Sequence, residues 1–263
     1  MSDYLLVEET TISCTARGDA DGLWSGLDEC WQEAFRQAWE ALRSGSIAVG
    51  ACAAMPDGTT IVHAARNRVA EVDGPPGEAF GSALAHAEVN VLARLAFRQP
   101  RRLVLTTTLE PCLQCSAAIR LGPIAAVRFA GADPLWLGCH DFSPLSAREA
   151  TRTQVPMTGP RTDEVGLFGA LIARFGLGLN ARNLEHLRAG GQAGLIDLVQ
   201  GMEADGEVPE LAAMDVGEAF RHVFPRLQAL RENTAPAAER TRDDGWQSAS
   251  AADDSLSPEG GRL

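Results

Sequence analysis

Regular spacing of apolar residues predicts that ordered structure begins near Leu27. Between 27 and 43 the apolar positions recur at spacings of three and four, at Leu27, Trp31, Phe35, Ala38 and Leu42. This spacing predicts an amphipathic helix, which the small residues at 44–46 end. Two short apolar runs follow, at 47–55 and 59–69, with a Pro-Asp-Gly turn between them. They predict a hairpin of two buried strands.

The pattern then alternates between helical and strand-like segments. A Gly- and Pro-rich loop leads into a helix at 83–97, and strands at 103–110 and 125–131 flank a second helix at 111–122. A fifth strand is expected within 150–157, before a helix at 163–176. Such alternation is typical of the α/β class. We expect a three-layer α/β/α sandwich with a mixed sheet of about five strands.

Beyond Asn180 the pattern predicts helices only, at 181–189, 193–202 and 216–232. Residues 233–263 are rich in Ala, Ser, Pro, Gly and Asp, a composition typical of disordered segments. We therefore expect four parts: an N-terminal extension at 1–26, a core domain at 27–178, a helical C-terminal extension at 179–232 and a disordered tail at 233–263.

Charge disfavours a polyanionic partner. The formal net charge is -12, and all 23 basic residues are Arg. Most of the excess acid lies outside the predicted core, since residues 26–140 hold 10 Arg against 11 acidic residues. Binding to nucleic acid needs clustered positive charge, so we expect nucleic acid to be an improbable partner. Arg residues gathered by the fold could still overturn this expectation.

The chain contains no apolar run of the roughly 18 residues that a membrane-spanning helix needs, and its first residues do not resemble a secretion signal. We expect a soluble, cytoplasmic protein without a membrane partner. The six cysteines, at 14, 30, 52, 112, 115 and 139, are irregularly spaced and do not indicate a disulfide framework.

One constellation carries chemistry. His86 and Glu88 lie at the start of one predicted helix, and Cys112 and Cys115 lie at the start of another, directly after Pro111. Cysteines three apart on a helix can direct both sulfurs at one ion, and Pro111 fits the first helical turn because no N–H is needed there. His86, Cys112 and Cys115 are thus candidate zinc ligands. Three protein ligands leave the fourth position open to water, as in catalytic zinc sites.

Glu88 lies two residues after the candidate ligand His86 and is a candidate proton shuttle. The pattern His-x-Glu followed by Pro-Cys-x-x-Cys is the signature of zinc-dependent base deaminases. In their reaction, water adds to the ring carbon that bears an amine, and the glutamate passes a proton to the ring and then to the departing ammonia.

From about Leu27 to Leu137 the sequence resembles the cytidine deaminase-like superfamily, in the branch of guanine, cytosine and bacterial tRNA adenosine deaminases. The matching segments stand in the family order: IAVGA, AARNRV, LAHAEVNVL, LTTTLEPCLQC and VRFAGAD. The resemblance implies Zn²⁺ as cofactor and a homodimer. By position it implies Asn67 as a contact to base or sugar, the Ala87 backbone N–H as a contact to the base, and Glu110 and Pro111 at the pocket edge. The chain departs from tRNA-acting relatives in its Gly/Pro loop at 74–82 and in the apolar segment 121–127.

Several alternatives stay open. A structural zinc would need a fourth ligand from Cys52, Cys139 or His140, and the Cys pair could instead be redox-active. Asn67 could cap a turn, and Trp136 could either stack on a flat base or pack against the core. We expect zinc-dependent deamination of a small-molecule base or nucleoside. The alternatives are a tRNA adenosine deaminase and a catalytically silent relative that serves as an interaction protein.

Overall fold

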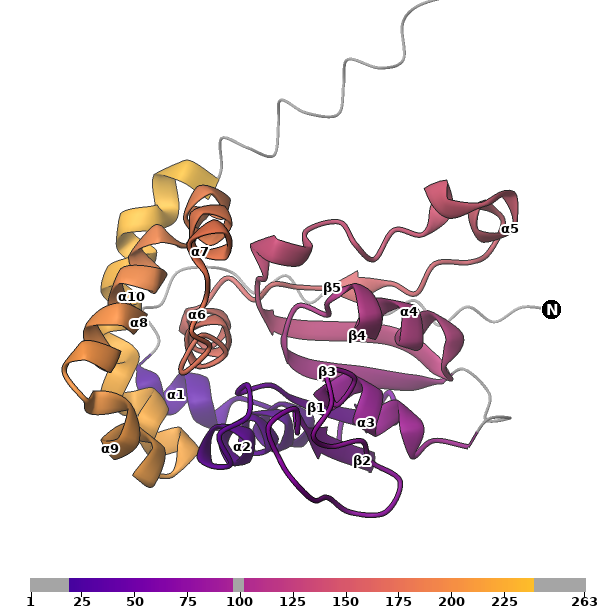
Figure 1. Cartoon of the computed structure of the whole chain (residues 1–263), viewed down its shortest axis with the longest axis horizontal. Helices are drawn as coiled ribbons and strands as arrows, with labels where there is room; N and C mark the ends of the chain where they lie inside the picture. Colours follow the sequence, from indigo (N-terminus) through magenta and orange to yellow (C-terminus); the bar gives the residue numbers. More distant parts are fainter. Residues whose placement is uncertain (1–18, 97–101, 239–263) are drawn as a thin grey trace, which may run out of the picture.

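A computed structural model describes residues 19–96 and 102–238. Its centre is a mixed five-stranded sheet in the order β2-β1-β3-β4-β5 (Figure 1). The strands are β1 Gly50–Ala54, β2 Ile61–Arg66, β3 Leu103–Leu109, β4 Ile124–Gly131 and β5 Met157–Thr158. Strand β1 is antiparallel to β2 and β3, whereas β3, β4 and β5 run parallel. The expected α/β fold with a mixed sheet of five strands is confirmed.

Helices cover both faces of this sheet. They are α2 Glu29–Arg43 and α6 Glu164–Ile172 on one face, and α3 Ala87–Ala93 and α4 Leu113–Leu121 on the other. Strand β1 serves both layers, because Ala51 and Ala53 pack with α3 whereas Cys52 and Ala54 pack with α2. This alternation is the period-2 side-chain pattern of a strand buried on both faces.

Two close approaches in the layer of α2 and α6 require glycine. A Cβ at Gly50 would lie 2.1 Å from the carbonyl oxygen of Ala34 in α2. A Cβ at Gly131, at the end of β4, would lie 2.4 Å from the backbone nitrogen of Ala170 in α6. The absence of a side chain at both positions lets the helices lie directly on the strands.

The strands differ from the sequence prediction in two details. Strand β2 is an edge strand with Ile61 exposed, so only β1 of the expected hairpin is buried on both faces. The fifth strand is only Met157–Thr158, later and shorter than expected. It follows an excursion from β4 that contains the short helices η1 Pro134–Trp136, η2 Ser143–Leu145 and α5 Ala147–Ala150.

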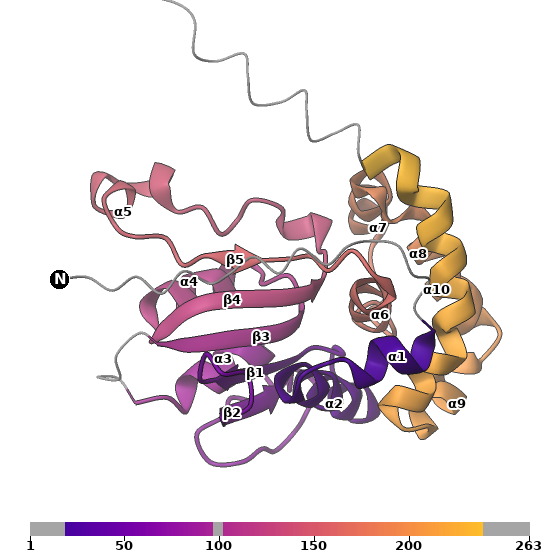
Figure 2. The same cartoon turned by 180° about the vertical axis from the view of Figure 1, so that it is seen from behind.

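The C-terminal helices form a further layer against α2 and α6 (Figure 2). They are α7 Ala181–Leu187, α8 Ala193–Ala204, α9 Glu207–Ala213 and α10 Val216–Ala238, with a π-helical segment η3 Arg188–Gln192 between α7 and α8. Three of the four were expected, but the pattern gave no sign of α9. The disordered tail predicted at 233–263 is wrong at its start, because α10 continues to Ala238, and residues 239–263 lie outside the described residues.

A short helix, α1 Ala20–Ser25, joins this layer from the other end of the chain. Its Trp24 contacts the rings of Phe35, Phe168 and Phe220, which come from α2, α6 and α10. The C-terminal helices therefore share one aromatic core with the helices that cover the sheet. Among the described residues, no helix has the length and apolar character needed to cross a membrane.

Candidate metal centre and cavity

The candidate ligands meet at the carboxyl end of β3. His86 is the residue that caps the N-terminus of α3, and Cys112 holds the same position on α4. Neither side chain hydrogen-bonds to the first turn of its helix, so both are free to face each other. In open α/β sheets, ligands bind beyond the carboxyl ends of parallel strands, and this site follows that rule.

The three ligand atoms have the spacing that a single zinc ion requires. His86 Nδ1 lies 3.4 Å from Cys112 Sγ and 3.3 Å from Cys115 Sγ, and the two sulfurs are 3.5 Å apart. Tetrahedral zinc with ordinary bond lengths would place such atoms about 3.6 to 3.8 Å apart. Within the described part of the chain, these three residues form the one group with suitable metal-ligand geometry.

The surroundings of the two sulfurs favour a thiolate at one of them. The hydrogen bond between the two sulfurs, together with the nearby His86, lowers the pKa of Cys112 to about 4. The same hydrogen bond raises the pKa of Cys115. The contact with Cys112 also raises the pKa of His86. One sulfur is therefore a thiolate, the form that binds metals.

Glu88 lies beside this centre in a buried position. Its Oε2 is 3.3 Å from Cys115 Sγ, and its Oε1 accepts a hydrogen bond of 3.1 Å from the hydroxyl of Thr107 on β3. Burial raises the pKa of Glu88. A carboxyl with a raised pKa in a cleft is suited to exchange a proton near neutral pH.

A cavity of about 240 Å³ opens in front of these groups. The expected contacts Asn67 and Trp136 both line it, together with Glu110. Asn67 Oδ1 accepts a hydrogen bond from Val69 N, so this side chain caps a turn while it lines the cavity. Trp136 is 39% exposed, so it stands at the rim rather than inside a core.

Two other expected contacts lie elsewhere. Ala87 is fully buried in the hydrophobic cluster beneath the sheet and is not among the residues that line the cavity. Pro111 precedes the capping residue Cys112, so the expectation that it occupies the first turn of α4 is wrong. Its carbonyl accepts a hydrogen bond from the Ser116 hydroxyl, which orders the start of α4.

The alternative ligands Cys52, Cys139 and His140 lie outside the group of three. Cys52 lies on the far side of β1, where its Sγ is 3.5 Å from that of Cys30. Cys139 approaches Ser116 and the Pro111 carbonyl. His140 borders a second cavity, of about 390 Å³, on the other side of Glu110. None of them joins His86, Cys112 and Cys115 in a metal-binding group.

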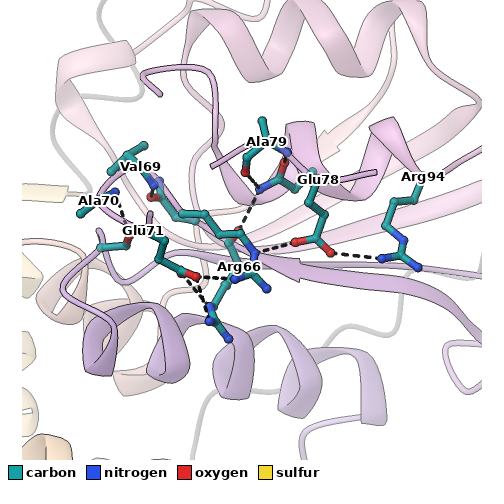
Figure 3. Close-up of polar contacts among 11 residues, drawn as sticks. Arg66, Val69, Ala70, Glu71, Glu78, Ala79 and Arg94 are labelled. Atoms are coloured by element: carbon teal, nitrogen blue, oxygen red, sulfur yellow. Dashed lines mark hydrogen bonds and ion pairs between the residues drawn. The ribbon is translucent and has the colours of Figure 1, made fainter. Parts of the chain in front are cut away.

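An ion-pair network holds the loop that runs from Asn67 to His86, which contains the Gly/Pro segment 74–82 (Figure 3). Glu71 binds both Arg66 and Arg68, and Glu78 binds Arg68 and Arg94. Asn90 of α3 completes the clasp, because its side-chain amide bonds the backbone N–H and carbonyl of Ala79 and the carbonyl of Arg66. The loop is thus held to β2 and α3, the two elements that it joins.

Sequence reasoning missed three polar residues of the site. Thr107 contacts Glu88 from β3, and Asp133 and Arg174 line the cavity as a buried ion pair of 2.9 Å. The only available signal for Arg174 was a single charge within the apolar stretch 167–175. Nothing in the sequence pattern indicated that Asp133 was its partner.

Comparison with known proteins gives a family for this region. Residues 26–130 match the model of the cytidine and deoxycytidylate deaminase zinc-binding region. Among solved structures, one from a study of A-to-I editing by tRNA:A34 deaminases is 22% identical, with a TM-score of 0.40, covering 49% of this chain and 96% of that chain. Guanine deaminase from Bacillus subtilis is 24% identical, with a TM-score of 0.33 over 50% of this chain and 81% of that one.

The dCMP deaminase from cyanophage S-TIM5 is 15% identical, with a TM-score of 0.30, and the match covers 50% of this chain and 100% of that chain. A search of curated proteins finds no match. The family model matches residues 26–130 alone, which is less than half of the chain. The individual structures carry no argument about the substrate.

Proposed function

Because residues 26–130 match the model of the cytidine and deoxycytidylate deaminase zinc-binding region, we propose that this protein hydrolytically deaminates an uncharged nucleobase or nucleoside as a free small molecule. The observation that carries the proposal is the convergence of His86, Cys112 and Cys115 with Glu88 in the wall of one cavity. Retention of Glu88 also favours an enzyme over a silent relative, which has no need of a proton shuttle.

His86, Cys112 and Cys115 would hold the zinc, and when bound the metal supplies Lewis-acid activation of water. Glu88 takes the proton that water loses and delivers it to the ring nitrogen beside the reacting carbon. Water oxygen forms a bond to that carbon. Glu88 then takes the second proton from this oxygen and passes it to the amine, the exocyclic C–N bond breaks, and the amine leaves as ammonia. Thr107 holds Glu88 in place through its hydrogen bond to Oε1.

Asn67 and Trp136 are the proposed contacts to the substrate. The Oδ1 of Asn67 is engaged by Val69 N, which leaves its amide nitrogen to donate to an acceptor on the base or sugar. Trp136 offers an aromatic face at the rim, on which a flat base can stack. The Ala87 backbone N–H and Pro111 stay weaker proposals, since neither residue lines the cavity.

Charge favours an uncharged substrate. The cavity is lined by three carboxyl groups, Glu88, Glu110 and Asp133, against one guanidinium, that of Arg174. Two thiolates would also offset the charge of a zinc ion. A phosphate group would therefore enter against excess negative charge, which disfavours nucleotides.

The surface likewise offers little support for a tRNA substrate. Most arginines in the described ranges are neutralised by acidic partners, as in the network of Figure 3. Three of them, Arg102, Arg148 and Arg182, form no ion pair with another described residue. Scattered single charges supply less of the phosphate binding that nucleic-acid recognition needs than a basic face does.

The test is an ammonia-release screen of free bases, nucleosides, nucleotides and a tRNA anticodon stem-loop, with zinc content measured on the same preparation. We expect release from a base or nucleoside with about one zinc per chain, and no release by Glu88→Ala protein that retains its zinc. Activity confined to the stem-loop, with steep salt dependence, would overturn the proposal in favour of a tRNA adenosine deaminase. Failure to release ammonia from any substrate would favour the silent relative. Sedimentation of the same preparation tests the expected homodimer.

A further inference from the structure

Arg174 is a buried charged residue whose hydrogen-bonding capacity is only partly used. It follows the C-terminus of α6 and lines the catalytic cavity, yet its side chain is only 3% exposed. Its Nη2 donates to Asp133 Oδ1 at 2.9 Å and to Gln192 Oε1 at 3.4 Å. These two bonds fix the guanidinium between the end of β4 and the C-terminal helices.

The other donors of Arg174 lack acceptors. A guanidinium has five N–H donors, of which Nη2 carries two, and Nε and Nη1 carry the other three. Nε is buried and has no hydrogen-bond partner among the described residues, and Nη1 makes no hydrogen bond to them either. Unpaired donors on a buried charge are costly, so such a group in a cavity wall points to an acceptor brought by a ligand.

The surroundings of Arg174 keep these donors in position. Gln192 accepts from Nη2 and donates through Nε2 to the carbonyl of Ala132, so the C-terminal segment ties the guanidinium to the loop after β4. Arg174 and Leu179 also border a third cavity, of about 180 Å³, which is lined by residues of α7 and α8 and is separate from the cavity at His140. Arg174 thus stands where the catalytic cavity meets the helical layer.

We propose that Arg174 determines substrate specificity by donating from Nη1 to an uncharged oxygen of the substrate. The oxygen is uncharged because Glu88, Glu110 and Asp133 share the cavity and would repel an anion. Two sources have this chemistry, a carbonyl on the ring or a hydroxyl on an attached sugar. This inference rests on the proposed function and adds the substrate group that is recognised.

The test compares matched pairs of substrates with the full-length, zinc-loaded protein. Guanine against 2-aminopurine and cytosine against 4-aminopyrimidine remove the ring oxygen. Cytidine against cytosine and adenosine against adenine remove the sugar. For the substrate that carries the recognised oxygen, Arg174→Lys should lower kcat/KM by about 10- to 100-fold. For the substrate that lacks this oxygen, kcat/KM should change little, so the preference of the enzyme for the oxygen is lost. The pair that responds identifies the oxygen.

Arg120→Lys is the matched control. Arg120 is also buried and paired with a carboxylate, Glu149, but it does not line the catalytic cavity. The double variant Arg174→Met with Asp133→Asn removes the same donors without leaving a buried charge. Binding of the same pairs to the Glu88→Ala protein supplies a readout that needs no turnover.

The outcomes separate the two ideas. Ammonia release by wild-type protein with unchanged preference in both Arg174 variants overturns the role of Arg174 alone, and so does an equal change in Arg120→Lys. A wild-type protein that releases no ammonia overturns the proposed function and this inference with it. Loss of preference in both Arg174 variants, with Arg120→Lys unaffected, is the expected result.

Discussion

The two largest hydrophobic clusters among the described residues are built from different side chains. The cluster between the sheet and α3 and α4 consists mainly of Ala, Val, Leu and Ile, such as Ala51, Ala53, Leu105 and Val91. The cluster beneath the C-terminal helices is rich in large rings from α1, α2, α6 and α10, with Phe168 at its centre. The first supports the metal centre, and the second joins the C-terminal helices to the sheet.

This difference matters because α2 and α6 lie between the sheet and the C-terminal helices, on the face of the sheet opposite the first cluster. They cover one face of the sheet and also supply rings to the aromatic cluster. The first cluster packs α3 and α4, whose N-cap residues are His86 and Cys112, against the strands with mostly small side chains. In the second cluster, large rings pack against one another between helices. The comparison predicts that damage to the metal centre and damage to the helical layer have separable effects on activity and a shared effect on unfolding.

The largest effect on activity is expected from Cys112→Ser. The change removes one of three metal ligands, so zinc should be lost and ammonia release should fall by ~10³-fold or more. The aromatic cluster does not contact Cys112, so near-ultraviolet circular dichroism from its rings should persist. Zinc content and activity measured together check this. A variant that retained both would remove Cys112 from the metal centre.

The largest effect on stability is expected from Phe168→Ala. Phe168 is fully buried and contacts the rings of Trp24, Phe35, Trp39 and Phe220. Truncating a ring in such a cluster costs about 3–5 kcal/mol of unfolding free energy. Zinc should remain bound in the protein that is still folded.

The matched control for Phe168→Ala is Leu105→Ala in the other cluster, which should cost about 2–5 kcal/mol. Because α2 and α6 pack on the sheet and also supply rings to the aromatic cluster, each variant should lower one common denaturation transition. Two separate transitions, with Phe168→Ala moving only one of them, would mean that the C-terminal helices form an independent domain.

The metal centre could be predicted from sequence because its signal is local. His86 with Glu88, and Cys112 with Cys115, each lie within one helix start, and spacing along a helix fixes which residues face together. The order of helices and strands in 27–176 was equally accessible, since apolar periodicity changes clearly from one element to the next.

The helical layer and the far wall of the cavity could not be predicted in this way. Trp24 lies in a polar segment, and the rings that it contacts are supplied by three distant helices. Arg174 reads as an ordinary charge, because its partner Asp133 is 41 residues away. Contacts of this kind depend on how helices pack, which periodicity does not encode.

The pH dependence of stability distinguishes the ion-pair network of Glu71 and Glu78 from the two apolar clusters. Burial alone would raise the pKa of Glu71, but its hydrogen bond to Arg66 and the charges of Arg66 and Arg68 outweigh burial and hold the pKa below 4.5. A carboxyl with a depressed pKa in the folded state stabilises the protein above its unfolded-state pKa. That contribution is lost as the pH falls through the folded-state value.

Glu71→Gln should therefore lower the free energy of unfolding by about 3 kcal/mol at neutral pH. The variant should also lose less stability than the wild-type protein as the pH falls below ~4.5. Melting temperatures across a pH series give the measurement. Glu207→Gln is the control, since Glu207 pairs with Arg226 at a more exposed site and should cost at most about 1 kcal/mol. A clasp that contributed only at the surface would give equal effects for the two variants.

The smallest effect on stability is expected at the ion pair of Asp28 and Arg128. Asp28 caps the N-terminus of α2 by accepting from Trp31 N, and it also pairs with Arg128 of β4 at 2.6 Å and 3.0 Å. Both charged side chains are partly exposed, so the pair should contribute at most about 1 kcal/mol, and less in high salt. Asp28→Asn keeps a capping side chain and removes the charge, whereas Asp28→Ala removes both and should cost about 1 kcal/mol more. Denaturation at low and high salt separates these contributions. If Asp28→Asn lowered the free energy of unfolding as much as Phe168→Ala, the ion pair of Asp28 and Arg128 rather than the aromatic cluster would join the two regions.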